Sequence, residues 1–95
     1  MRLSEKVQQK IEVIVKKMGP GIKVGMPSIN FTDFRLDAPI WINDDRKVIE
    51  IPKEFIDNFF DTATFEQEIK GAINDLKARG IKRIRVTDTG RTVVE

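Results

Sequence analysis

The stretch of sequence that decides the fold is IWINDDRKVIEIP, residues 40–52. Two runs rich in isoleucine and valine, residues 40–42 and 47–51, flank the polar residues 43–46. β-Branched runs on either side of an Asn/Asp-rich turn are typical of a β-hairpin. Proline suits the first position of a helix, so Pro52 predicts that a helix follows the hairpin directly.

The residues before this hairpin predict one helix and two more strands. Residues 3–18 repeat apolar side chains every three or four positions, as one face of an amphipathic helix does. These side chains are Leu3, Val7, Ile11, Ile14, Val15 and Met18. The Gly-Pro-Gly sequence at residues 19–21 ends the helix. Alternation then predicts strands at residues 22–26 and 29–36, the second with an irregularity near Thr32 and Asp33. Residues 37–39 turn the chain into the hairpin.

The residues after the hairpin predict two helices and a second hairpin. A short helix comes first, with phenylalanine and isoleucine on one side. Thr64 then opens a capping-box pattern, and apolar residues at helical spacing continue to Gly80, which ends the next helix. Residues 81–87 alternate as a strand, and residues 92–94 are its partner across a turn at residues 88–91.

The predicted order of elements is α-β-β-β-β-α-α-β-β. Strands followed by helices indicate the α+β class, so we expect a mainly antiparallel sheet with three helices packed on it. A chain of 95 residues has the usual size of one domain, and we expect a single domain over residues 1–95. No apolar run approaches the roughly 18 residues that cross a bilayer. The first residues also lack the apolar core of a secretory signal, so we expect a soluble, cytoplasmic protein with no membrane partner.

Two residue types that carry much of enzyme chemistry are missing, because the chain has no cysteine and no histidine. Catalysis by Ser-His-Asp or Cys-His arrangements is excluded, and so are zinc sites built from these side chains. We expect a protein that is not an enzyme, with no catalytic residue, metal or cofactor. A carboxylate- or metal-dependent enzyme is the third alternative, because Glu54, Asp57 and Asp61 share one edge of the short helix and carboxylates bind hard cations.

Charge is unevenly distributed along the chain. Residues 1–25 carry six basic and two acidic side chains, residues 26–76 carry five and eleven, and residues 77–95 carry six and two. Basic ends and an acidic middle attract one another within a subunit or between two subunits. The alternative is a basic face that binds nucleic acid.

Four apolar residues are candidates for a partner-binding surface. Trp41 alternates out of phase with the isoleucines on either side of it, so it points away from the core if they face it. Val13 lies off the apolar face of the first helix. Phe59 and Phe60 belong to the Phe-rich short helix. Exposed aromatic side chains are common anchors of protein interfaces, so we expect these four to contact a protein partner or a second copy.

The alternative binding site is the basic segment at residues 77–91. Arg83 and Arg85 project to the same side of the predicted strand, where they could pair with successive phosphates. No aromatic residue lies among them, which argues against stacking on bases. The candidate nucleic-acid-binding residues are Lys77, Arg79, Lys82, Arg83, Arg85 and Arg91.

Together these patterns favour a small non-catalytic interaction module that self-associates, forming a homo-oligomer, or binds another protein. Nucleic-acid binding through residues 77–91 is the second hypothesis, since the same basic segment could face phosphates instead of the acidic middle of another subunit.

Overall fold

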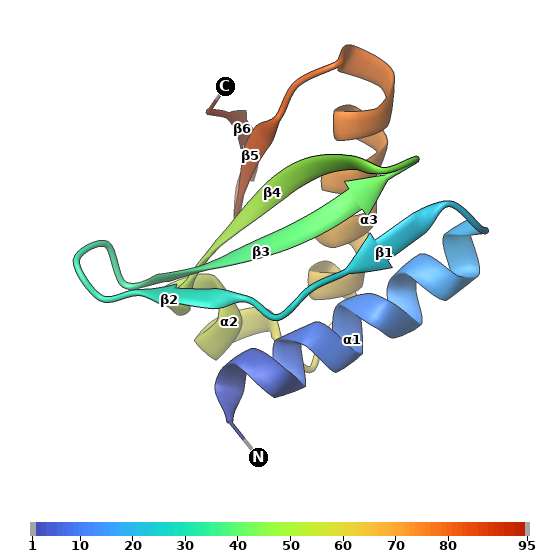
Figure 1. Ribbon diagram of the computed structural model, residues 1–95. Coiled ribbons are helices and arrows are strands. Elements are labelled where there is room, and N and C mark those ends of the chain that lie inside the picture. The colour runs from blue at the N-terminus through green and yellow to red at the C-terminus, as the bar shows by residue number, and fades with distance from the viewer. Residues whose placement is uncertain (1, 95) are drawn as a thin grey trace.

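The computed structural model describes residues 2–94, which fold into three helices and a six-stranded sheet (Figure 1). In chain order the elements are α1 (Leu3–Met18), β1 (Ile22–Val24), β2 (Ser28–Asn30), β3 (Arg35–Ile42), β4 (Asp45–Pro52), α2 (Lys53–Phe59), α3 (Ala63–Arg79), β5 (Arg83–Thr87) and β6 (Gly90–Val93). The predicted order of elements and the α+β class are confirmed. No helix in this range is long and apolar enough to cross a membrane.

The sheet is mainly antiparallel. Its strands follow the order β1-β3-β4-β5-β6, and β2 pairs with β3 on the same side as β1. Among the described strands, the one parallel pair is β4 with β5, and α2 and α3 connect them. The helices lie on one face of the sheet, which we call the helix face, and the other face is the open face (Figure 1).

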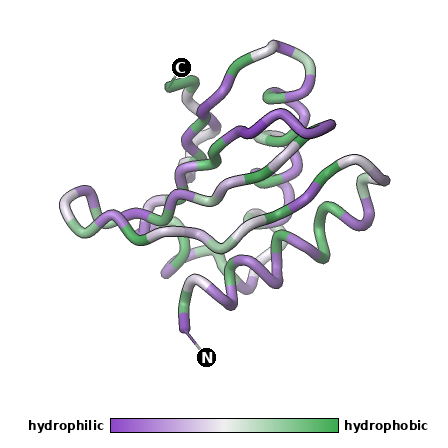
Figure 2. Tube along the Cα trace, viewed as in Figure 1, coloured by the Kyte–Doolittle hydropathy of each residue, from purple (hydrophilic) through white to green (hydrophobic). Residues whose placement is uncertain are grey.

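Side chains that alternate along the strands build the core on the helix face. Every second residue of β3 is buried, and β4 and β5 add isoleucine and valine in register with them. Hydrophobic and hydrophilic residues also alternate along α1 (Figure 2). Its apolar side chains belong to the same core. The sheet contributes Leu36, Ala38, Ile40, Ile42, Ile49, Ile51, Ile84 and Val86 to this core.

β3 is longer than the sequence indicated, and the turn predicted at residues 37–39 is wrong. These residues form the middle of β3, where Pro39 pairs with Val48 of β4. The Pro39 carbonyl accepts a hydrogen bond from the Gly25 N–H (3.0 Å), which directly follows β1. The N–H and C=O of a strand residue point to the same side, so the N–H that proline lacks would face the gap between β1 and β2. Proline is tolerated here because that side of β3 is only partly paired.

The first hairpin turns more tightly than predicted. Its loop is Asn43 and Asp44 alone, with φ values of 52° and 68°, and Ile42 already pairs with Asp45. Two positive φ values in a two-residue loop are those of a type I′ turn, whose twist matches the twist of the flanking strands. β4 therefore begins two residues earlier than the sequence predicted.

The C-terminal elements match the prediction except at their ends. The capping box expected at Thr64 does not form, because α3 begins two residues earlier than predicted and Thr62 takes the N-cap position. The Thr62 hydroxyl donates to the Phe59 carbonyl (2.7 Å) rather than accepting from a helix N–H. β5 and β6 pair as a hairpin whose loop is residues 88–89.

Candidate interaction surface

The loop between β2 and β3 projects from one end of the sheet (Figure 1). It consists of residues 31–34, Phe-Thr-Asp-Phe, in a segment that the sequence predicted as one strand. Asn30 fixes the loop, since its Oδ1 accepts hydrogen bonds from the N–H groups of Thr32 (3.1 Å) and Asp33 (3.0 Å). Such a turn is typical of asparagine, whose side chain bonds the backbone two or three residues further on.

Both phenylalanines of this loop are exposed to solvent. Phe31 is 78% exposed and Phe34 is 69% exposed. Phe34 has a φ of 50°, in the left-handed region that bulky side chains rarely adopt. Its carbonyl accepts a hydrogen bond from the Lys53 N–H (2.8 Å), which ties the loop to the start of α2. The loop therefore holds two aromatic rings in solvent, one of them on a strained backbone.

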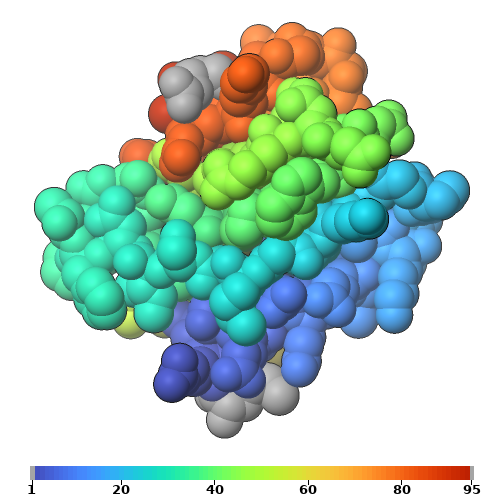
Figure 3. All heavy atoms as spheres, in the orientation of Figure 1, coloured from blue at the N-terminus to red at the C-terminus, as the bar shows by residue number. Residues whose placement is uncertain are grey.

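Beside the loop lies an apolar groove with a volume of about 330 Å³, which we call the hairpin groove. Its lining comes from α1, β2, the loop, β3 and α2: Leu3, Ile29, Asn30, Phe31, Phe34, Leu36, Lys53 and Ile56. Figure 3 shows the loop protruding in teal, near the blue N-terminal turns of α1. The groove thus joins segments that are far apart in the sequence.

This end of the molecule concentrates apolar surface that the core leaves uncovered. Among residues 2–94 the exposed large apolar side chains are Leu3, Val13, Met26, Ile29, Phe31, Phe34, Val93 and Val94. Half of them line the hairpin groove. A contiguous exposed apolar patch is characteristic of a site that binds another molecule. Since polar groups that would orient a small substrate are scarce here, the groove suits the apolar side chains of a protein partner.

Two of the four residues predicted to bind a partner lie on opposite sides of the molecule. Trp41 lies on the open face, where it is half-buried against its own chain. A Cβ built on Gly25 would lie 2.9 Å from the Trp41 ring and 3.0 Å from Pro39, so the indole covers the glycine. Val13 is 54% exposed on the outer side of α1. These two residues cannot contact the same small partner surface.

The other two predicted residues, Phe59 and Phe60, lie at the edge of the core. The Phe59 ring is 5.2 Å from that of Phe55, and the Phe60 ring is 5.3 Å from that of Phe65. The Lys10 ammonium lies 4.4 Å above the Phe60 ring and also donates to the Phe60 carbonyl. Both rings are half-buried by the chain itself, which leaves less of them for a partner than at Phe31 and Phe34.

The open face carries a cluster of charged side chains around Glu50. The Glu50 side chain is 2% exposed although it points away from the helices. Arg83 donates to one carboxylate oxygen (2.9 Å), and Arg85 donates to the other through Nε (2.9 Å) and Nη2 (2.7 Å). Arg35 lies beside them, with Nε 2.8 Å from Asp37 and 3.7 Å from Glu50. Ion pairs rather than a helix therefore cover the centre of this face.

The environment of Glu50 keeps it ionised. Burial raises the pKa of the Glu50 carboxyl, but hydrogen bonds from Arg83 and Arg85 and the charge of Arg35 outweigh burial and hold the pKa below its ordinary value. A carboxylate with a lowered pKa, whose oxygens are occupied by arginine donors, is poorly suited to accept a proton in catalysis. The arrangement therefore favours a structural role for Glu50.

The structure divides the six residues predicted to bind nucleic acid among three surfaces. Arg83 and Arg85 lie on the same face, as the alternation predicts, but both bind Glu50. Arg91 lies on the helix face, where two carboxylates of α3 bind it. Exposed at the junction of α3 and β5 are Lys77, Arg79 and Lys82. The basic segment therefore does not form one continuous face.

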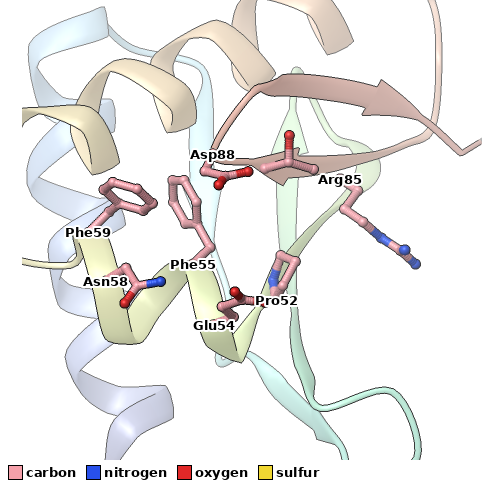
Figure 4. A pocket seen from close by; sticks show the side chains of 8 residues that line it. Pro52, Glu54, Phe55, Asn58, Phe59, Arg85 and Asp88 are labelled. Carbon is pink, nitrogen blue, oxygen red and sulfur yellow. The ribbon is translucent and has the colours of Figure 1, made fainter.

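A second hollow of about 310 Å³ lies between α2 and the β5–β6 turn (Figure 4). It is lined by Pro52, Glu54, Phe55, Asn58, Phe59, Arg85, Thr87 and Asp88. The Arg85 side chain extends away from the acidic residues of this hollow and binds Glu50 instead (Figure 4). The hollow therefore presents carboxylate and amide groups. No positively charged side chain of its lining points into it, so it is poorly suited to bind an anion.

The acidic edge predicted on the short helix is only partly formed, because α2 ends at Phe59 and Asp61 lies beyond it. Asp57 binds Lys53 one turn away on the same helix (2.7 Å). In the part of the chain that the structure describes, no three metal-ligating side chains come together. The third alternative, a carboxylate- or metal-dependent enzyme, therefore stays a hypothesis without such a cluster among the described residues.

The sequence pattern predicts one irregular strand over residues 29–36 instead of two strands joined by a loop, and the loop phenylalanines are missed for that reason. Two signals were present in the sequence. Asn30 and Asp33 are turn-forming residues, and Phe31 and Phe34 are three residues apart, which breaks the two-residue alternation of a strand. Together they indicate a hairpin loop rather than an irregular strand.

No family model matches the chain, and neither a curated protein nor a solved structure matches it significantly.

Proposed function

We propose that this chain is a non-catalytic interaction module that binds a protein partner through the hairpin groove. The observation that carries the proposal is the exposure of Phe31 and Phe34 beside an apolar groove, while the other aromatic side chains are buried or half-buried. Each ring left in water forgoes about 2 kcal/mol of hydrophobic stabilisation. Exposure of these rings does not stabilise the fold, whereas exposed aromatic side chains are common anchors of a binding surface.

The lining of the groove defines the chemistry of the partner. Its surface is almost entirely apolar, and the Lys53 ammonium at its rim already binds Asp57 (2.7 Å). The fitting partner is a protein segment that brings bulky apolar side chains, since these would displace water from the groove without leaving polar groups unpaired.

Selection from a displayed library of random peptides tests this proposal. We expect enriched peptides to carry several bulky apolar residues. The affinity of a synthetic enriched peptide should fall at least about tenfold for the variant Phe31→Ser/Phe34→Ser, which is about 1.4 kcal/mol. The variant should fold, because both side chains are exposed.

Val13→Ser is the matched control, because Val13 is exposed on α1 outside the groove. It should bind the peptide as tightly as the original chain does. Peptides that bind the double serine variant equally well, or a selection that enriches no peptide, would contradict the proposal.

Nucleic-acid binding is the second proposal, supported by the three exposed cations Lys77, Arg79 and Lys82 at one corner. It has less support than the groove because Arg83 and Arg85 both donate to Glu50 and do not point freely into solvent with the other cations. Fluorescence anisotropy with labelled single-stranded and duplex oligonucleotides should show binding that weakens with salt. Changing the three exposed cations to glutamate should abolish it, and no anisotropy change at low salt rules this alternative out.

A further inference from the structure

β6 is the edge strand of the sheet, and within residues 2–94 it pairs with β5 alone. The Val94 N–H donates to the Arg83 carbonyl (3.0 Å), so these two residues form a hydrogen-bonded pair. Hydrogen-bonded pairs alternate along an antiparallel ladder, so Thr92 is the preceding residue that bonds β5. The backbone N–H and C=O groups of Arg91 and Val93 therefore point to the free edge.

This edge carries few of the features by which proteins usually block pairing. Residues 90–94 are Gly-Arg-Thr-Val-Val, without proline or lysine, and their pairing with β5 is regular. Val93 and Val94 are also exposed. The opposite edge differs, because β1 and β2 have three residues each and Pro27 lies between them. A regular, unblocked edge is a template for another strand.

The charged residue of this edge is neutralised within its own subunit. Arg91 packs over Gly71 of α3, where an added Cβ would lie 2.4 Å from the guanidinium. Its Nε donates to Asp75 (3.0 Å) and its Nη1 to Glu68 (2.8 Å). The Arg91 charge is therefore compensated and does not repel a second strand that carries the same arginine.

We propose that a second copy of this chain pairs with this edge, antiparallel, with the two-fold axis at Thr92. In this register Arg91 of each copy faces Val93 of the other, and each pair exchanges its free backbone hydrogen bonds. Thr92 faces its own counterpart in a non-hydrogen-bonded pair, and threonine pairs stabilise antiparallel sheets. A strand that complements itself in this way is what a two-fold interface requires.

No like charges oppose one another directly in this register. The Arg85 side chains of the two copies would lie three strand spacings apart, about 14 Å. That separation exceeds the screening length of about 8 Å at physiological ionic strength. The inference does not rest on the hairpin groove, which lies toward the opposite edge of the sheet.

Disulfide trapping tests the register, because the chain has no cysteine of its own. Directly opposed residues in a non-hydrogen-bonded pair have Cα atoms about 4.5 Å apart, which a disulfide can bridge. The variant Thr92→Cys should therefore form a covalent dimer under mild oxidation. We expect the reaction to be at least about tenfold faster than for Val13→Cys, which is exposed on α1 and reacts only through random encounters.

Val94→Cys is the control for register. The two copies of this residue would lie four positions apart, about 13 Å along the strands, and should not link. If Thr92→Cys links no faster than Val13→Cys, or if Val94→Cys links as fast as Thr92→Cys, the proposed pairing is wrong.

The mass in solution gives an independent test. The original chain should scatter light as a dimer of 10.9 kDa subunits. Val93→Pro should be monomeric, because it removes an N–H that points to the partner and not to β5. If the original chain stays monomeric at every concentration, the proposal is wrong, whatever the mass of the Val93→Pro variant is.

Discussion

Glu50 determines how the open face of the sheet is built. Its carboxylate is buried, yet it points away from the helices and lies among Arg35, Arg83 and Arg85. A buried charge is costly unless it is paired, and here both oxygens receive arginine donors. Removal of the carboxylate would leave three guanidinium groups close together without their shared partner.

The lowered pKa of Glu50 predicts a specific dependence of stability on pH. Its contribution to the free energy of unfolding is complete above the unfolded-state pKa, about 4.3, and is lost as the pH falls through the lower folded-state pKa. Glu50→Gln should cost about 1–3 kcal/mol at neutral pH, because the charged hydrogen bonds are lost. Urea unfolding measured from neutral to acidic pH should show that the free energy of unfolding falls less with acid in this variant than in the original chain.

Glu54→Gln is the control for this titration, because Glu54 is an exposed carboxylate on α2. It should lose stability with acid as the original chain does. If the Glu50→Gln and Glu54→Gln variants show the same pH dependence, Glu50 does not contribute as described.

Phe34 predicts a conflict between stability and binding. Its positive φ is unfavourable for any residue with a Cβ, so Phe34→Gly should be more stable than Phe34→Ala by about 1 kcal/mol. Both variants remove the ring, so both should weaken peptide binding. Thermal unfolding followed by circular dichroism measures the difference, and equal melting temperatures would show that the backbone here is not strained.

Side-chain direction could be predicted from the sequence, whereas side-chain partners could not. Alternation correctly placed Trp41 on the face opposite Ile40, and Arg83 and Arg85 on one face. That both arginines bind Glu50 could not be predicted, because the contact depends on the parallel pairing of β4 with β5. Pairing between strands distant in sequence leaves no local pattern.

At the scale of elements, the side of β3 that faces β1 and β2 is interrupted, and the Trp41 indole covers the interruption. The Trp41 ring and Pro39 of β3 both lie against Gly25, which directly follows β1. An aromatic ring over a glycine compensates for the missing side chain in a sheet. This packing explains why the chain needs Gly25 although its φ is not positive.

Gly25→Ala is therefore expected to destabilise the fold by about 1–3 kcal/mol, because the added methyl group displaces the indole. The only tryptophan reports the change directly, and its emission should shift to longer wavelength as the ring becomes more exposed. In a Trp41→Val background the same change should cost less, because the added methyl group then meets Pro39 but no indole, and a double-mutant cycle would measure the difference. An equal cost in both backgrounds would contradict this packing.

The predictability of the elements follows from whether their signals are local. The bounds of α1 agree with the apolar repeat and the Gly-Pro-Gly stop. β3 was divided at Pro39 because proline usually ends a strand, and only the gap between β1 and β2 makes it acceptable there. The hairpin groove could not be predicted, since it needs α1, β2 and α2 to meet at one end of the molecule.

At the scale of the whole molecule, the two proposed interfaces lie toward opposite edges of the sheet. The hairpin groove is beside β2 and β3, whereas β6 is the last strand on the other side. A dimer paired through β6 would therefore leave both grooves uncovered and carry two binding sites. Two linked sites bind a surface that presents several ligands more tightly than one site does.

Avidity tests this arrangement. On a surface that carries groove-binding peptide at high density, the original chain should dissociate at least about tenfold more slowly than the monomeric Val93→Pro variant. At low peptide density the two should dissociate alike, because only one groove is engaged at a time. Surface plasmon resonance at both densities measures this, and equal rates at high density would argue against two accessible grooves in one dimer.

The parallel pairing of β4 with β5 also bears on the order in which the chain folds. The antiparallel pair β3–β4 closes through a two-residue loop, whereas β5 reaches β4 only after α2 and α3 have crossed the helix face. Closing a long connection has a larger entropic cost than closing a short one, so β5 and β6 should join the sheet last. Until then the edge of β4 that binds β5 is unpaired. The chain is therefore most prone to misassembly before the β5–β6 hairpin docks.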